Sequence, residues 1–316
     1  MGAGIVSEMH GRAVVATPDA ELIGVYDPKI ERAKALAKKF GGQVFPSLDD
    51  ALSHAGVKAV HVLTPPEGHV HVALASLRAG KHVLVEKPVA WKVSEIRQLQ
   101  NAARKANRVC MPAHNYIYNS ALQRAKGLID ARRLGTITSF WMLYNLFHSE
   151  EVAAVYGGVI RAVCVHHAYS LLYLLGRPKS VMAAVSCLHY TKLTCEDQVS
   201  VVCQMPDGVL ANLWCSMAAD DPTSDPWTVI YKLLGTKGGV VYSWNEAQLE
   251  DNRGPGWGLP CYEDAFKNEI GYFIEHCILG NEQPLSTLAD AADALRIIEA
   301  VERSHRHRRT ETVHYD

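Results

Sequence analysis

The stretch "TPPEGHVHVALASLRAGKHVLVEKPVA", residues 64–90, decides the fold of this chain. It opens at the end of the apolar run 59–65, passes through a helical pattern that closes at Gly80, and ends in a second apolar run. Strand, helix and strand at this spacing predict a βαβ unit with parallel strands and a right-handed crossover. Residues 64–66 and 86–88 then follow two adjacent strands, at the edge where ligands bind in open α/β sheets.

The same alternation of short apolar runs and helical patterns extends through about the first 115 residues. Beyond residue 120, apolar runs follow one another with turn signals such as "MPDG" and "GTKGG", which is typical of an antiparallel sheet. The fold class expected is an α/β Rossmann-type nucleotide domain plus an α+β domain with a mainly antiparallel, open-faced sheet. We place the first domain at residues 1–118 and the second, for substrate binding and oligomerisation, at 119–316.

The opening "MGAGIVS" reads as the phosphate turn of the nucleotide domain. Two glycines would allow a tight turn and a close approach of the backbone to a pyrophosphate, and the following helix would offer its first amides. An acidic residue should end the next strand about 20 residues on, to bind the ribose hydroxyls. Asp27 occupies that position, although it also suits a helix N-cap before Pro28. The cofactor contacts predicted here are Gly2, Gly4, Ile5, Val6 and Asp27.

Such a turn should follow a strand at the centre of the sheet, and only Met1 stands before it. Omission of a central strand would destabilise the sheet, because the neighbouring strands would lose their hydrogen-bond partners. We therefore expect that the natural chain starts upstream of Met1, with about five to eight apolar residues encoded in frame.

Composition limits the partners. The net charge is -1, which favours neither nucleic acid nor an anionic membrane, and we expect neither as a partner. No apolar run reaches the length of a membrane span, and the eight cysteines form no C-x-x-C pair, so we expect no metal site. Most of these cysteines lie in apolar runs, which suggests buried thiols and a reducing, cytoplasmic compartment.

The segment 64–90 resembles the glucose–fructose oxidoreductase / inositol dehydrogenase (Gfo/Idh/MocA) family, whose hallmark is A-G-K-H-V-x-x-E-K-P after a T-P turn and a helix. The resemblance extends over nearly the whole chain. It includes the opening G-A-G with His10 in the helix that follows, "NYIYNSALQRAKGLI", "LLGRPKSV", "LLGTKGGV" and the closing helices. An isolated Glu-Lys-Pro tripeptide would indicate a surface lysine beside a turn. Within the matching segment 64–90, a lysine of the binding site is the better interpretation.

The resemblance implies hydride transfer between a nicotinamide and a carbinol carbon of a sugar, cyclitol or sugar derivative. Lys87 matches the family's catalytic lysine. The acidic Asp27 suggests NAD rather than NADP, since a carboxylate repels a 2′-phosphate, although Lys29 and Arg32 lie close by. The family also implies a homodimer or homotetramer formed through the open face of the second sheet. Further positions expected at the cofactor are Thr64, Pro65, Pro66, His69, Glu86, Lys87 and Asn115.

The chain departs from the family where an Asp-x-x-x-His element is usual. Anchored on Gly176, the histidine is His166, while the two usual aspartates fall on Ala162 and Tyr169. His166 is still available as a general base and Lys87 as the donor that polarises the oxygen. Tyr169, one helical turn along, would share a face with His166. The residues predicted at the substrate are Lys87, Asn115, Tyr144, Arg161, His166, His167 and Tyr169, with a surface role open for Arg161 and a buried structural role open for His167.

Two loops add weaker candidates: "SMAADDPTSDPW", with Trp227 for stacking on a sugar, and the Gly/Pro-rich "DNRGPGWGLPCYED" as a lid or subunit contact. Three functions stay open on the sequence. The first is the NAD-dependent oxidoreductase, including glycoside-modifying chemistry with transient use of NAD. The second is a non-catalytic nucleotide- or sugar-binding sensor, which would fit the lost carboxylates. The third is an inactive product of truncation.

Overall fold

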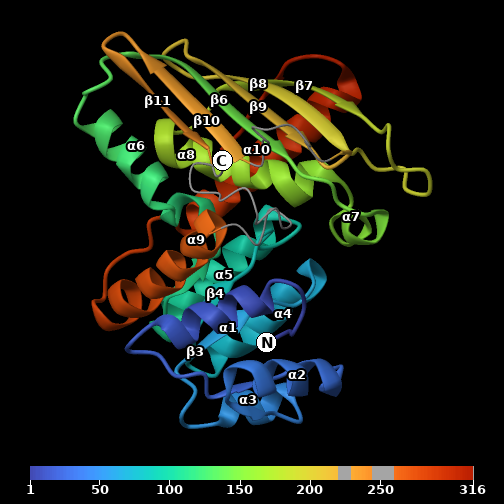
Figure 1. Cartoon of the computed structure of the whole chain (residues 1–316), viewed down its shortest axis with the longest axis vertical. Coiled ribbons are helices and arrows are strands. Elements are labelled where there is room, and N and C mark those ends of the chain that lie inside the picture. Colours follow the sequence, from blue (N-terminus) through green and yellow to red (C-terminus); the bar gives the residue numbers. More distant parts are fainter. Residues whose placement is uncertain (220–228, 244–259, 316) are drawn as a thin grey trace. The chain divides into compact units, whose positions relative to one another are not determined.

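The structure is a computed structural model that describes residues 1–219, 229–243 and 260–315 (Figure 1). The chain divides into two compact units. The first unit contains Met1–Tyr118 and Glu263–Ala292, and the second contains Asn119–Tyr262 and Asp293–Asp316. The division expected from the sequence gave everything after residue 118 to the second domain. In the structure, the segment 263–292 packs with the first unit instead.

The first unit alternates strands and helices as expected, because apolar runs of period two and helical patterns succeed one another. Ser47 caps one helix by accepting a hydrogen bond from the Asp50 N–H. The elements are α1 (Ser7–Ala16), β1 (Gly24–Val25), α2 (Ile30–Phe40), β2 (Gln43–Val44), α3 (Leu48–Ser53), β3 (Ala59–Val62), α4 (Pro66–Arg78), β4 (His82–Val85), α5 (Val93–Ala106), β5 (Cys110–Pro112), the 3₁₀ helix η1 (Asn115–Tyr118), α9 (Pro260–Gly271) and the π-helical η4 (Tyr272–Leu279).

Two separate parallel sheets carry this unit. One has the order β1-β2 and the other β3-β4-β5. Val62 pairs with Val85 and Val85 with Pro112, so these three strands end at one edge. Val83, Leu84 and Val85 of β4 are fully buried, as expected for a strand covered on both faces.

The second unit is built on one seven-stranded sheet of order β11-β10-β6-β9-β8-β7-β12. All its strand pairs are antiparallel except β6 with β9, so the predicted mainly antiparallel sheet is confirmed. In Figure 1, α6, α8 and α10 lie against one side of this sheet. The elements are α6 (Ser120–Asp130), β6 (Ile137–Asn145), α7 (Glu150–Tyr156), the π-helical η2 (Ile160–Cys164), α8 (Val165–Leu175), β7 (Ser180–Ser186), β8 (Gln198–Gln204), β9 (Leu210–Ser216), β10 (Val229–Gly235), β11 (Gly238–Ser243), α10 (Leu288–His307) and β12 (Glu311–Thr312).

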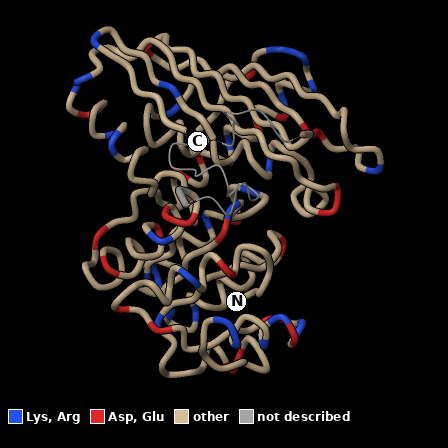
Figure 2. Tube along the Cα trace, in the orientation of Figure 1, with Lys and Arg blue, Asp and Glu red and all other residues tan. Residues whose placement is uncertain are grey.

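Lys and Arg are interspersed with Asp and Glu over both units, in keeping with a net charge of -1 (Figure 2). Within the described part of the chain, no single helix is long and apolar enough to cross a membrane, and one sharply bent pair, Glu150–Tyr156 with Ile160–Leu175, meets the length and composition test. The loop with Trp227 and most of the Gly/Pro-rich loop at 251–259 lie outside the described residues.

Candidate active-site residues

The segments 64–66 and 86–88 follow β3 and β4 at the same sheet edge, because Val62 and Val85 are direct partners in the ladder. The first segment leads straight into α4, with Pro66 in its first turn, where a missing N–H costs nothing. The second segment contains a cis peptide between Lys87 and Pro88. The predicted juxtaposition at the carboxyl edge is therefore present in the first unit.

His69 ties these two segments together. Its Nδ1 lies 2.8 Å from the Pro88 carbonyl oxygen, and its Nε2 lies 2.8 Å from the Thr64 carbonyl oxygen. The ring is almost completely buried, and burial lowers its pKa even though both carbonyls favour the protonated form. His69 had been predicted at the cofactor. Its two nitrogens hold the loops that surround the edge, so its observed part is to position them.

Glu86 is contacted by His10, which in turn contacts His61. His10 Nε2 lies 3.0 Å from Glu86 Oε1, and His10 Nδ1 lies 3.1 Å from His61 Nδ1. The other oxygen of Glu86 accepts the backbone N–H of Lys87 at 3.0 Å. Burial alone raises the pKa of Glu86, but the hydrogen bond and charge of His10, with Lys87, outweigh it and lower the pKa. Glu86 is therefore an ionised, immobilised carboxylate next to the lysine.

Lys87 is partly exposed at the end of β4. Desolvation lowers its pKa, and the charge of Glu86 acts in the opposite direction. A lysine whose pKa is lowered this way can exchange a proton more readily than an ordinary surface lysine. The arrangement gives Lys87 the properties expected of a proton donor to a substrate oxygen.

The opening turn is built as a nucleotide turn requires. Gly2 has φ +91°, and a Cβ there would meet the Leu63 carbonyl oxygen at 2.5 Å, so only glycine fits. The Ala3 N–H donates to Asp27 Oδ2 at 2.7 Å, and the Lys29 N–H donates to Oδ1 at 2.7 Å. Asp27 thus links the turn to Lys29, the residue before α2, but it is not the N-cap residue of that helix, and its contact with a ribose stays a prediction.

This turn fits the phosphates of a dinucleotide. A Cβ on Gly4 would meet no atom within 4 Å, so the backbone is open to a close approach. Ile5 is exposed beside it, and Val6 precedes the first turn of α1. Thr64 Oγ1 is buried with no hydrogen-bond partner among the described residues, and the Thr64 backbone borders Gly2. A bound polar group would satisfy that hydroxyl.

Sequence reasoning missed Glu269 on α9. Its side chain is fully buried, and neither carboxyl oxygen has a hydrogen bond within the described residues. Burial, together with the charge of Glu86, raises its pKa well above the usual value, and Glu269 in turn helps raise the pKa of Tyr118. The available signal was its position between Phe266 and Phe273, which are also buried and lie three and four residues away on the same helical stretch.

The second unit, taken by itself, contains the predicted histidine His166 and its neighbours. His166 lies in the first turn of α8, and its Nδ1 is 2.5 Å from the Tyr169 hydroxyl, so the predicted shared face is observed. Both side chains are buried. Ala162 lies on η2, where the family pattern would supply a carboxylate. His167 is fully buried, and burial lowers its pKa to about 3, while the backbone of Trp214 acts in the opposite direction.

Two predicted substrate residues have partners within the second unit. Tyr144 on β6 places its hydroxyl 2.8 Å from His148 Nε2. Arg161 forms a bidentate contact with Glu302, with Nε to Oε1 at 2.6 Å and a terminal nitrogen to Oε2 at 2.9 Å. The surface-type, structural role left open for Arg161 therefore accounts for its geometry, and we no longer assign it to the substrate. Asn115 lies in the first unit, buried at the start of η1.

Comparison with known proteins decides the family. Residues 1–114 match the model of the oxidoreductase family with an NAD-binding Rossmann fold, and residues 122–241 match the Gfo/Idh/MocA C-terminal domain. The chain belongs to the Gfo/Idh/MocA family. It is therefore an oxidoreductase of this family with an NAD-binding domain, which confirms the predictions of family, fold, enzyme class and cofactor.

The similar proteins include two curated enzymes and a solved structure. The chain is 25% identical to the inositol 2-dehydrogenase of Rhizobium meliloti over 96% of this chain and 95% of that protein. It is 33% identical to the glucose-6-phosphate 3-dehydrogenase of Bacillus subtilis, over only 44% of this chain and 39% of that enzyme. A structure from Sinorhizobium meliloti 1021, solved as a candidate myo-inositol dehydrogenase, has a TM-score of 0.89 at 25% identity, covering 99% of this chain and 98% of the other.

Proposed function

We propose that this oxidoreductase transfers hydride between a nicotinamide and a carbinol carbon of a sugar, cyclitol or sugar derivative. The observation that carries the proposal is Lys87 at the carboxyl edge of β4, with a lowered pKa and an ionised Glu86 fixed beside it. The names of the similar proteins agree with a polyhydroxylated substrate. The nicotinamide would accept the hydride. The residues of the chain would orient the substrate and transfer its hydroxyl proton.

In oxidation, Lys87 would hold the substrate hydroxyl and stabilise the oxygen as it becomes a carbonyl. His166 would accept the hydroxyl proton, with its ring oriented by the Tyr169 hydroxyl at Nδ1. A tyrosine in this role replaces the carboxylate that the family pattern places at position 162. Because a neutral hydroxyl stabilises an imidazolium less than a carboxylate does, we expect a weaker general base than the family's usual pair.

NAD is the preferred cofactor in this proposal. Asp27 would accept the ribose hydroxyls, since each carboxylate oxygen has a lone pair left beyond the one backbone N–H it binds. Its negative charge would oppose a 2′-phosphate. The backbone of residues 2–6 and the Thr64 hydroxyl would hold the phosphates and the adjoining groups.

The open face of the second unit's sheet supports a homodimer or homotetramer. One row of paired residues across the sheet contains the exposed side chains of Val241, Trp141, Val202 and Met182. Lys232 and Asn212 lie in the same row, between these apolar residues. Four exposed large apolar side chains on one face favour a covering partner, here a second copy of the chain. The seven cysteines whose side chains the structure describes are free thiols, which supports a cytoplasmic location.

The test is NADH formation with a panel of cyclitols, hexoses and sugar phosphates, comparing the wild-type chain with Lys87→Ala. We expect turnover on at least one compound and a fall in kcat/KM of about 10³-fold in the variant. Lys105→Ala, an exposed lysine on α5, is the matched control and should retain full activity. Nicotinamide binding without turnover on any compound would instead favour a sensor, the alternative that the missing carboxylate at Ala162 suggests.

A further inference from the structure

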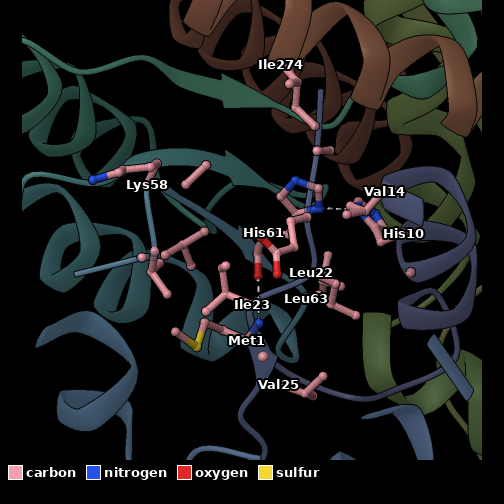
Figure 3. A pocket seen from close by; sticks show the side chains of 18 of the residues that line it. Met1, His10, Val14, Leu22, Ile23, Val25, Lys58, His61, Leu63 and Ile274 are labelled. Carbon is pink, nitrogen blue, oxygen red and sulfur yellow. Dashed lines mark hydrogen bonds between the residues drawn. The ribbon is translucent and has the colours of Figure 1, made fainter. Parts of the chain in front are cut away.

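One helical stretch of the first unit, α9 continued by η4, packs against the two histidines that lie next to Glu86. Phe266 places its ring edge-on to the ring of His10, with 5.3 Å between the centroids, and Phe273 contacts the ring of His61 in the same way at 5.9 Å. Figure 3 shows the contact between the two histidine rings. His10 in turn contacts the Glu86 carboxylate, so this helical stretch covers the histidines that hold it.

Glu269 lies on the same face of this stretch, three residues after Phe266 and four before Phe273. The residue is 0% exposed, and neither carboxyl oxygen has a hydrogen bond within the described residues. A buried carboxylate without a counter-charge or a hydrogen bond is so unfavourable that such a group takes up a proton instead. The surroundings of Glu269 therefore favour the un-ionised carboxylic acid in the free protein.

The ionisable groups around Glu269 come from two other elements. The charge of Glu86, which follows β4, adds to burial in raising the pKa of Glu269. Glu269 in turn contributes to the raised pKa of the buried Tyr118 on η1. His10 and Lys87 act on Glu86 and lower its pKa. One buried region thus contains two carboxyl groups of opposite state, an ionised Glu86 and an un-ionised Glu269.

The proposed hydride transfer would bring a further charge to this region. Lys87 would hold the substrate oxygen, so the nicotinamide that accepts hydride from the adjacent carbon must lie beside Lys87 and Glu86. The nicotinamide is positively charged in NAD⁺ and neutral in NADH. A positive charge lowers the pKa of nearby carboxyl groups. Because Glu86 is already ionised, Glu269 is the carboxyl group of the two whose protonation can respond.

We propose that Glu269 is a redox-linked proton site. It keeps its proton in the free protein and beside NADH, and it releases that proton to solvent when NAD⁺ binds. After hydride transfer has removed the positive charge, the Glu269 carboxylate takes one proton back from solvent. The hydroxyl proton of the substrate leaves separately, by the route proposed above. This inference rests on the proposed function, because it needs a nicotinamide beside Lys87.

The linkage predicts how cofactor affinity depends on pH. Since NAD⁺ binding releases a proton from Glu269, the affinity for NAD⁺ should rise with pH, by about threefold or more between pH 7 and pH 9. Glutamine carries no proton to release, so this part of the rise should be absent in Glu269→Gln. The affinity for NADH should show no difference in pH dependence between the two proteins.

Calorimetric titration with NAD⁺ and with NADH at pH 8, in phosphate and in Tris, counts the protons released, because the two buffers differ in their heat of ionisation. The wild type should release on the order of half a proton more than Glu269→Gln with NAD⁺, and the same number with NADH. Lys87 can also lose a proton beside a cation, but that part is common to both proteins. Glu275→Gln, exposed on η4, is the control and should behave as the wild type.

The outcomes separate this inference from the proposed function. Equal proton release by the wild type and Glu269→Gln, with NAD⁺ bound to both, would overturn the linkage alone. Absence of binding of either nucleotide to the folded proteins would overturn the proposed cofactor site and the linkage with it. Infrared difference spectra of the free proteins at pH 7 should show the carbonyl band of one un-ionised carboxylic acid in the wild type and its loss in Glu269→Gln. Identical spectra in this region would overturn the proposal without any cofactor present.

Discussion

The predicted site residues of the first unit have more fixed surroundings than those of the second unit. At the Lys87 edge of the first unit, His10 contacts both Glu86 and His61, and His69 contacts the carbonyls of both loops. In the second unit, His166 has the Tyr169 hydroxyl at one nitrogen and Ala162 where a carboxylate is usual. The difference teaches that the residues around Lys87 keep the family pattern, whereas the proposed general base, His166, is contacted by a neutral hydroxyl in place of a carboxylate.

The largest effect expected from testing this comparison is at the proposed general base. His166→Ala should lower kcat/KM by about 10³-fold and Tyr169→Phe by about tenfold, because the second change removes only the group that orients the ring. NADH binding should stay within about twofold in both variants. The exposed His305→Ala is the control. Full activity in His166→Ala would show that the second unit supplies no base.

Glu86→Gln tests the residues around Lys87 in the first unit. We expect kcat/KM to fall by about 10²-fold and the free energy of unfolding at neutral pH to fall by about 1–3 kcal/mol, since His10 loses a charged partner. The folded-state pKa of Glu86 is lowered from 4.5, so its stabilisation is present above pH 4.5 and is lost as the pH falls through the folded-state pKa. Urea unfolding at two pH values checks both statements. Glu31→Gln, an exposed glutamate on α2, is the control, and an acid response in Glu86→Gln equal to that of the wild type would refute this linkage.

Asp27→Asn sharpens the cofactor assignment. The amide keeps one acceptor for the turn and removes the charge, so the preference for NADH over NADPH should fall by about tenfold. Dissociation constants for the two cofactors, measured in parallel, give the ratio. An unchanged ratio would mean that Asp27 only holds the turn.

Glu269→Gln should have the smallest effect, a rise in thermal midpoint of about 2–4 °C at pH 8. The folded-state pKa of Glu269 is raised, so its favourable contribution is complete below 4.5 and is lost as the pH rises toward the folded-state value. Glutamine is neutral at every pH, and the difference from the wild type should vanish near pH 4. Glu275→Gln, exposed on the same stretch, should show no such pH dependence. A midpoint unaffected at pH 8 in Glu269→Gln would mean that the carboxyl is ionised in the fold.

The sequence predicts what local patterns determine. The alternation of strands and helices in the first unit and the contact of His166 with Tyr169 depend on residues close together in the chain, and both are observed. The resemblance to a family located Lys87 and Glu86 at the right edge of the sheet.

Contacts between segments that are distant in the chain could not be predicted from the sequence. His10 reaches His61 and Glu86 across 51 and 76 residues, and no spacing rule connects them. The packing of 263–292 with the first unit, and with it Glu269, depends on which apolar faces meet. Arg161 gave no sign of its partner Glu302, 141 residues away. The short helix α7 was also missed, because its seven residues carry too little of a periodic pattern.

The central claim is that the first unit is an NAD site next to Lys87. Titration with NADH and with NADPH, followed by nicotinamide fluorescence, tests it most directly. The account predicts that NADH binds at least about tenfold more tightly than NADPH. Absence of NADH binding in the folded protein, or equal binding of the two cofactors, would contradict it.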